Sequence, residues 1–294
     1  MWFKNLQLYR LRAWQDSAEA LSTHLSRLPL QSCGASDMQR SGWVPPNDED
    51  FVYPLASHFL ICLGTEKKLL PASVIAQHTR QRAEEFEQTR GYKPGRKQLK
   101  DLKEATTDEL LPRAFAVQRK TYAWIDQKGG WLVVDSANVA RAEEVLEHLR
   151  KCAVEFTATP VRTQLSPASA MTRWLTDDAP PTAFTIDQDC ELRARQDERM
   201  KVRYAHHALD TADIQQHVKG GKEVARLALT WAQKISFMLD DTLQIKRLSP
   251  LDILTERTQG NDDAFASDFA LMTAELGHLI PDLIEALDGL DEPS

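Results

Sequence analysis

Residues 90–115 read RGYKPGRKQLKDLKEATTDELLPRAF, and the rest of the chain is organised around this stretch. Its first part, Arg90 to Lys103, carries six Lys and Arg residues against one acid, a net charge of +5. Two glycines and a proline interrupt a helical pattern within residues 91–95, and such residues end helices and let the chain reverse. The stretch therefore predicts a projecting hairpin of two helices with a basic tip. The cations at or beside the predicted turn are Arg90, Lys93, Arg96 and Lys97.

The charge along the chain is unevenly distributed. The segment from Thr258 to Ser294 has nine acidic residues and no Lys or Arg, and the whole chain has a formal net charge of −7. An acidic chain that gathers a local basic block favours a polyanionic partner, or contact between the basic and acidic surfaces of subunits. A solvated helical face gives the same pattern, so charge alone leaves these interpretations open.

Length and composition indicate an ordinary soluble protein. The 294 residues allow one or two domains with a substantial core, and 42% are hydrophobic and 27% charged. No apolar run has the roughly 18 residues of a membrane span, and no signal peptide is recognisable. The four cysteines are scattered without a C-x-x-C pair, which is typical of reduced thiols. We expect a cytoplasmic protein without metal or cofactor.

Local patterns predict a mixture of strands and helices. Apolar runs bounded by turn residues predict strands at Trp2–Leu11, His58–Leu63, Lys67–Leu70, Tyr122–Asp126, Trp131–Asp135, Phe156–Val161, Phe184–Ile186, Ile235–Leu239 and Leu243–Leu248. Helical spacing predicts helices at Asp16–Leu28, Ala72–Gln88, Ala137–Lys151, Asp210–Gln233, Phe265–Leu279 and Pro281–Leu287. Residues from Cys33 to Asp50 and from Asp177 to Pro181 are expected to be loops.

The order of these elements predicts the fold class. Apolar strand, turn, strand, proline and helix occur twice, at Phe59–Ile75 and at Phe237–Leu254, a weak echo that suggests two related halves. Strands joined as hairpins, rather than in strict β-α-β alternation, favour an α+β fold with antiparallel sheets and a helical C-terminal region.

The search for catalytic or metal-binding motifs finds none that we would assign. Gly220-Gly221-Lys222 lacks the first glycine of a phosphate loop, and the adjacent His206-His207 side chains diverge. Asp240-Asp241 and Asp262-Asp263 could in principle hold Mg²⁺, but they are more simply a hairpin turn and a helix start. We therefore predict a protein that is not an enzyme.

A second basic cluster and the aromatic residues point to phosphate contact. Trp124 and Trp231 lie on predicted core faces, and the basic segments carry few aromatics, chiefly Tyr92 and Tyr204. Base-stacking proteins interleave aromatic and basic residues, so the pattern here favours the nucleic-acid backbone over the bases. The second cluster comprises Arg193, Arg195, Arg199, Lys201 and Arg203.

Several motifs, in order along essentially the whole chain, resemble the bacterial recombination-associated RdgC family. They are Met1–Leu6, Gly42–Pro46, Leu110–Phe115, Trp124–Asp126, Leu227–Trp231 and Phe269–Leu276. The resemblance implies a nucleoid-associated, ring-shaped homodimer that threads duplex DNA through a basic ring with little sequence preference and binds single strands more weakly. It also implies restraint of RecA during recombination and replication. Catalysis is not established for the family, although an old label calls it a putative exonuclease.

The resemblance also assigns roles to individual residues. Arg113 matches an arginine implicated in DNA contact, and Phe115 matches a phenylalanine of the apolar dimer contact, although a core aromatic is the alternative for Phe115. The basic tip, Arg90 to Lys97, corresponds to the family's finger. Near Arg203 the family has Lys and Gln where His206 and His207 stand here. If these histidines touch DNA, their contact should weaken as the pH rises through about 6.5.

The family architecture divides the chain into four parts, at residues 1–75 and 116–190 for the ring body, 76–115 for the finger and 191–294 for the second basic cluster, a hairpin and an acidic helical tip. Two other function classes stay open. A metal-dependent nuclease using Asp pairs would shorten DNA when Mg²⁺ is present. A protein-interaction adaptor, whose basic hairpin meets an acidic partner, would have no affinity for DNA.

Overall fold

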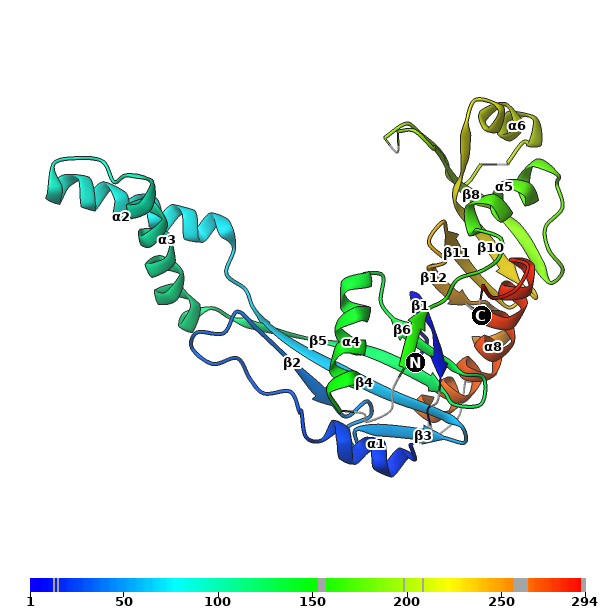
Figure 1. The fold of residues 1–294 in the computed structure, drawn as a ribbon, viewed down its shortest axis with the longest axis horizontal. Helices are drawn as coiled ribbons and strands as arrows, with labels where there is room; N and C mark the ends of the chain where they lie inside the picture. The colour runs from blue at the N-terminus through cyan, green and yellow to red at the C-terminus, as the bar shows by residue number, and fades with distance from the viewer. Residues whose placement is uncertain are drawn as a thin grey trace. The chain divides into compact units, whose positions relative to one another are not determined.

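A computed structural model describes residues 1–12, 14, 16–152, 157–197, 199–207, 209–255 and 264–291 (Figure 1). The chain forms two compact units. Unit 1 comprises residues 1–18, 53–60 and 122–294, and unit 2 comprises residues 19–52 and 61–121. Strands β4 (His58–Lys68) and β5 (Ala116–Asp126) contribute residues to both.

An antiparallel sheet forms the centre of unit 1, in the strand order β5-β6-β1-β12-β11-β10-β8-β9, with β7 also paired to β1. Its strands besides β5 are β1 (Leu6–Arg12), β6 (Trp131–Asp135), β7 (Thr157–Pro160), β8 (Phe184–Ala194), β9 (Lys201–Tyr204), β10 (Lys222–Trp231), β11 (Ile235–Asp240) and β12 (Ile245–Pro250). Its helices are α4 (Val139–Cys152), α5 (Pro167–Thr176), α6 (Thr211–Lys219), α7 (Asp252–Thr255) and α8 (Ala264–Ala286).

One large core fills unit 1. Side chains from α5, α6 and α8 pack against the apolar face of β8 and β10–β12. On β10, buried Leu227, Leu229 and Trp231 alternate with Arg226, Ala228 and Thr230, which are partly exposed. This period of two buries one face of the strand and leaves the other face open.

Unit 2 combines a smaller sheet with helices. Strand β2 (Gln39–Val44) pairs with β4 in antiparallel register, with Gly42 opposite Gly64. Its helices are α1 (Ala18–Leu25), α2 (Ala72–Arg90), α3 (Arg96–Leu110) and the short 3₁₀ helix η1 (Leu111–Arg113). The remaining strand, β3 (Val52–Leu55), pairs with β4, and all of it but Val52 belongs to unit 1. Figure 1 shows α2 and α3 side by side, beyond the ends of β2 and β4.

The α+β class with antiparallel pairing is confirmed, because the pairs β1–β6, β1–β7, β1–β12, β2–β4, β5–β6, β8–β9, β8–β10, β10–β11 and β11–β12 are antiparallel. The predicted helical hairpin, the hairpins at 122–135 and 235–248 and the helix at 137–151 are present. Trp124 and Trp231 are buried as expected. The predicted strands at 156–161 and 184–186 correspond to β7 and to the start of the longer β8, with residue 156 outside the described residues. Among the described residues, no helix is both long and apolar enough to cross a bilayer.

Two predictions near the N-terminus are wrong. The expected loop from Cys33 to Asp50 contains β2, and the strands expected at His58–Leu63 and Lys67–Leu70 are not separated by a turn, because Gly64–Glu66 lies inside the continuous strand β4. Glycine at 42 and 64 reflects close packing: a Cβ at Gly42 would lie 2.5 Å from the backbone nitrogen of Leu30. The weak echo is therefore not a repeated local structure, since a hairpin forms only in its second copy.

The helix predicted from Asp210 to Gln233 is also wrong in its second half. Asp210 does cap a helix, its carboxylate accepting the Ala212 N–H, but α6 ends at Lys219. Gly221 then adopts a left-handed φ of 83°, and the chain continues as strand β10. Small apolar residues satisfied the helical spacing locally, but pairing with β8 and β11 determined the outcome.

Two further differences concern helices. The C-terminal acidic region forms one helix, α8, which continues through Pro281. Proline removes one hydrogen bond at a cost of about 3 kcal/mol, and buried Leu279, Ile280 and Leu283 around it supply compensating core contacts. Helix α5 was not predicted. It begins at Pro167 after the capping residue Ser166, whose hydroxyl accepts the Ser169 N–H.

Candidate nucleic-acid interface

The turn between α2 and α3 holds the basic tip. Helix α2 ends at Gly91, which has φ 75° and donates its N–H to the Glu87 carbonyl at 2.8 Å. Before α3, the Gly95 N–H donates to the Gln98 side chain at 2.9 Å. Both bonds satisfy backbone groups that helix ends leave unpaired. The sequence thus closes a tight reversal at the place where its cations are concentrated.

Two side-chain contacts hold the hairpin together. Arg82 on α2 forms an ion pair with Glu109 on α3. The ring of Phe86 on α2 meets the ring of Tyr92 in the turn edge to face, with centroids 5.6 Å apart. Because one contact joins the two helices and the other joins α2 to the turn, the tip is held on a defined support.

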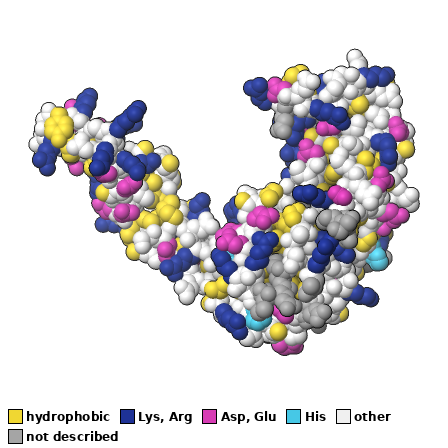
Figure 2. Space-filling model, viewed as in Figure 1, with side chains coloured by type: hydrophobic (Ala, Val, Ile, Leu, Met, Phe, Trp, Pro, Cys, Tyr) yellow, Lys and Arg dark blue, Asp and Glu magenta, His cyan; other side chains and the backbone are white. Residues whose placement is uncertain are grey.

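Lys and Arg side chains surround the end of this hairpin (Figure 2). Four cations there, which we call the tip cations, are exposed: Arg90, Lys93, Arg96 and Lys97. Within the part of the chain that the structure describes, none of them forms an ion pair. Lys100, by contrast, lies 3.5 Å from Glu104. The tip cations are therefore available to an external anion.

Arg113 and Phe115 lie where the hairpin returns to the sheet. Arg113 ends η1 and is exposed. Phe115 has 85% of its surface exposed, which rules out the core-aromatic alternative within one chain. Leu69 and Val117 are also large, apolar and exposed, and the Leu69 N–H donates to the Phe115 carbonyl at 2.7 Å. An exposed apolar group of this kind is typical of a contact surface.

The second basic cluster is largely paired with acids. Arg193 lies 3.3 Å from Glu191 and 3.4 Å from Asp241. Arg195 and Arg199 form ion pairs with Glu223 at 2.8 Å and with Asp197 at 3.1 Å, respectively. Arg203, on β9, is exposed and forms no ion pair with another described residue. Of this cluster, Arg203 is the arginine best placed to meet an external anion.

His206 and His207 follow β9 and are both exposed. His206 has a left-handed φ of 52°, and its backbone N–H donates to the Asp189 carboxylate at 2.9 Å. The His207 ring lies 6.1 Å from the ring of Tyr204. Their expected DNA contact and its pH dependence stay predictions.

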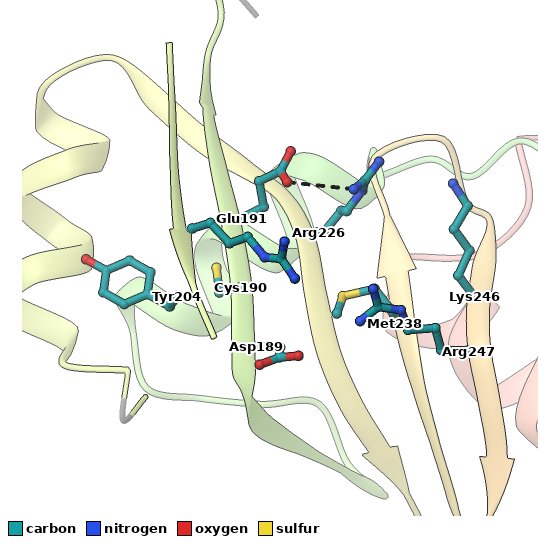
Figure 3. Close-up of a pocket in the computed structure, with 9 residues that line it drawn as sticks. Asp189, Cys190, Glu191, Tyr204, Arg226, Met238, Lys246 and Arg247 are labelled. Carbon is teal, nitrogen blue, oxygen red and sulfur yellow. Dashed lines mark ion pairs between the residues drawn. The ribbon is translucent and has the colours of Figure 1, made fainter. Parts of the chain in front are cut away.

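A cavity on the open face of the sheet of unit 1 adds residues that sequence reasoning missed (Figure 3). Arg226 from β10 and Lys246 and Arg247 from β12 line it, together with Arg203. Arg226 lies 3.7 Å from Glu191, and the Lys246 ammonium lies 2.7 Å from Asp240. Strand alternation in β10 would have indicated Arg226, but the segment was interpreted as a helix.

Asp240 serves the β11–β12 turn rather than a metal. One carboxylate oxygen accepts hydrogen bonds from the backbone and hydroxyl of Thr242 and from the Gln244 N–H, and the other accepts from Lys246. Burial raises the pKa of the neighbouring Asp241, and the charge of Arg193 opposes this rise. The described residues contain no group of three side chains suited to a metal ion. Asp262-Asp263 lies outside them.

Nearly the whole chain is similar to a known protein family and to several named proteins. A family described as "Putative exonuclease, RdgC" matches residues 1–290. The chain belongs to the RdgC family. Proteins named "Recombination-associated protein RdgC" are 48% identical in Herminiimonas arsenicoxydans and 46% identical in Dechloromonas aromatica, each over 98% of both chains. The one in Bordetella pertussis is 44% identical over 98% of this chain and 99% of the relative.

These comparisons confirm the resemblance on which the residue assignments depend. The names differ on activity, since the family description mentions an exonuclease and the relatives' names mention recombination. No catalytic group emerges from the described residues. The comparisons therefore establish membership of the RdgC family, while recombination and exonuclease activity are named only for the relatives and the family.

Proposed function

We propose that this RdgC protein binds duplex DNA through the backbone phosphates, without sequence preference, and binds single strands more weakly. The observation that carries the proposal is the set of tip cations, which are exposed and form no ion pair with a described residue. Cations of this kind neutralise phosphates and release counterions, which gives sequence-independent affinity. Arg113, Arg203, His206 and His207 are proposed to add contacts.

The aromatic residues near the tip support backbone contact over base stacking. Tyr92 lies beside the tip cations, but its ring packs on Phe86 within the hairpin. Proteins that stack on bases present aromatic faces to successive nucleotides. In the hairpin the two aromatic rings pack on each other and the cations around them are exposed. This arrangement is expected of a surface that binds backbone phosphates.

We further propose that two copies form a closed ring and that the duplex passes through it. The exposed group of Leu69, Phe115 and Val117 supports an apolar contact between copies. In a two-fold symmetric ring each interface is self-complementary. A net charge of −7 with local basic segments suits an acidic exterior around a basic lumen. In this proposal residues 1–75 and 116–190 form the ring body, residues 76–115 the finger, and residues 191–294 the second basic cluster and acidic tip region.

The cellular role that we propose is restraint of RecA during recombination and replication, at the nucleoid. The support is membership of a family whose curated members are named for recombination. A ring on duplex DNA would limit the access of other proteins to the strands that it encloses. The proposal involves no catalysis and no cofactor.

Binding of unrelated duplexes, measured by fluorescence anisotropy and gel shift across a salt series with Mg²⁺ present, tests the function. Equal affinity for all sequences, a steep loss of affinity with salt and intact DNA would support the proposal. Absence of binding at low salt would refute it and favour the adaptor. Shortened DNA that a chelator protects would favour the exonuclease of the family description.

A further inference from the structure

Strand β12 contains a bulge that changes where its cations point. Ser236 on β11 pairs with Ser249 on β12, and Met238 pairs with Lys246. Between these two pairs β11 has one residue and β12 has two, so β12 carries one extra residue. Arg247 lies in this bulge with a left-handed φ of 53°. In a regular strand Lys246 and Arg247 would point to opposite faces of the sheet. Here both line the same cavity, while Leu248 remains in the core.

The opposite wall of the cavity is irregular as well. Cys190 and Ile186 on β8 face Leu227 and Leu229 on β10, so β8 carries two more residues than β10 over this interval. The extra length places Asp189 at the cavity, where its carboxylate accepts the His206 N–H. Bulges that re-aim side chains are frequent next to functional sites. With the register shift between Val224 and Arg226 on β10, three such irregularities border this one cavity.

We call this cavity the bulge pocket; it has a volume of about 160 Å³. Its charged lining residues are Asp189, Glu191, Arg203, Arg226, Lys246 and Arg247. Glu191 and Asp240 partner Arg226 and Lys246. Arg203 and Arg247 form no ion pair with any other residue in the described ranges. Two guanidinium groups thus border the bulge pocket without a carboxylate partner.

We propose that the bulge pocket binds a phosphate group between Arg203 and Arg247, and that this group is a phosphate of the DNA backbone. The guanidinium fork matches the oxygens of a phosphate, with two parallel hydrogen bonds to each arginine. Figure 3 shows Arg247 in front of Met238, next to Lys246 and on the cavity side of the sheet. The inference rests on the proposed function, since it places one backbone contact of the duplex outside the helical hairpin.

The backbone of Arg247 supports a binding role for its side chain. A left-handed φ is readily adopted by glycine and unfavourable for residues with a Cβ. Strain of this kind persists where surrounding structure imposes it, and it is concentrated at functional sites. An arginine in place of a glycine at this bulge supplies a cation to the pocket at the expense of local stability.

The test uses the full-length protein, the variants Arg203→Ala, Arg247→Gly and Asp189→Asn, and Arg195→Ala as control. Arg195 is exposed, lies in the same unit and is paired with Glu223 outside the bulge pocket. We expect Arg247→Gly to melt at the same or a higher temperature and to bind duplex about tenfold more weakly. Its salt slope should fall by about 1 for each copy of the chain that contacts the duplex. Asp189→Asn should bind more tightly, because a negative charge leaves the pocket while an oxygen remains for His206.

The outcomes separate the two proposals. If the wild-type protein binds duplex and the variants Arg203→Ala and Arg247→Gly bind it with the same affinity and salt slope, the bulge pocket is overturned. The proposed function would then still stand. A titration of wild-type protein with inorganic phosphate, followed by the ¹⁵N resonances of arginine side chains, tests the pocket without DNA. Shifts at Arg203 and Arg247, and none at Arg195, support it even if duplex binding fails; absence of these shifts overturns it.

Discussion

The backbone N–H of Leu69 donates a hydrogen bond to the carbonyl of Phe115, with 2.7 Å between nitrogen and oxygen. The bond joins the end of β4 to the start of β5 on either side of the helical hairpin. Both side chains remain exposed, as does Val117. The link therefore holds a group of large apolar residues at the base of the hairpin, where a second copy could cover them.

Replacing Phe115 with Glu should break the proposed contact between copies at this site and open the ring, because a charge would have to be buried in an apolar contact. A central aromatic contributes about 2 kcal/mol or more at an interface, which corresponds to a dissociation constant roughly 30-fold higher. Size-exclusion chromatography with light scattering measures the change in mass. Val139→Glu, at an exposed apolar residue of α4, is the control. An unchanged mass together with an unchanged elution volume for Phe115→Glu would contradict this assignment.

Removing tip cations should weaken DNA binding equally for all sequences. The double variant Arg96→Ala/Lys97→Ala is expected to lower the salt slope by about 2 for each copy in the ring, one for each phosphate contact. Fluorescence anisotropy over a salt series gives the salt slope on each of two unrelated duplexes. Lys128→Ala, at an exposed turn residue of unit 1, should leave the slope unchanged. A sequence-dependent effect of the double variant would argue against backbone contact.

Gly91→Ala should destabilise the helical hairpin by about 1 kcal/mol, because alanine is strained at a φ of 75°. No atom lies within 4 Å of the added Cβ, so the cost comes from the backbone rather than from a clash. Hydrogen exchange of the amides in the last turn of α2 reports the change. Gly95→Ala, at an ordinary negative φ, should cost less, and equal effects would contradict the explanation.

Buried cysteines should react with alkylating reagents more slowly than the half-buried one. Burial raises the pKa values of Cys62 and Cys190 to about 12, so both thiols stay protonated at neutral pH and react slowly. The pKa of Cys33 is also raised, by burial and by Glu66, but this side chain is only half-buried. Alkylation followed by mass spectrometry should label Cys33 first, and Cys62 and Cys190 only after unfolding.

Glu66 should make part of the free energy of unfolding depend on pH. Hydrogen bonds from the Gln118 side chain and the Cys33 N–H lower the pKa of Glu66. Its contribution is therefore present above the pKa of an unfolded glutamate, about 4.3, and is lost as the pH falls through the lower folded value. Melting temperatures from about pH 6 to about pH 3 should decline less steeply in Glu66→Gln. Glu84→Gln, at an exposed site on α2, should keep the wild-type profile.

Local rules were sufficient where a segment is stabilised by its own residues. The helical hairpin follows from helical spacing and from the breakers between Arg90 and Arg96, so the tip cations could be placed from sequence. The core positions of Trp124 and Trp231 follow from local patterns as well. These features depend on residues close together in the chain, and the motifs that identify the family are of the same local kind.

Tertiary structure alone decided the features that depend on distant residues. Strands β2 and β10 exist because partners elsewhere in the chain satisfy their backbone groups, although their local patterns suggest a loop and a helix. Pro281 remains inside α8 because the core packs on both of its sides. The bulge pocket could not be predicted from the sequence for the same reason. Arg203, Arg226 and Arg247 meet only after β8–β12 pair with an irregular register, and register is set by contacts across the sheet.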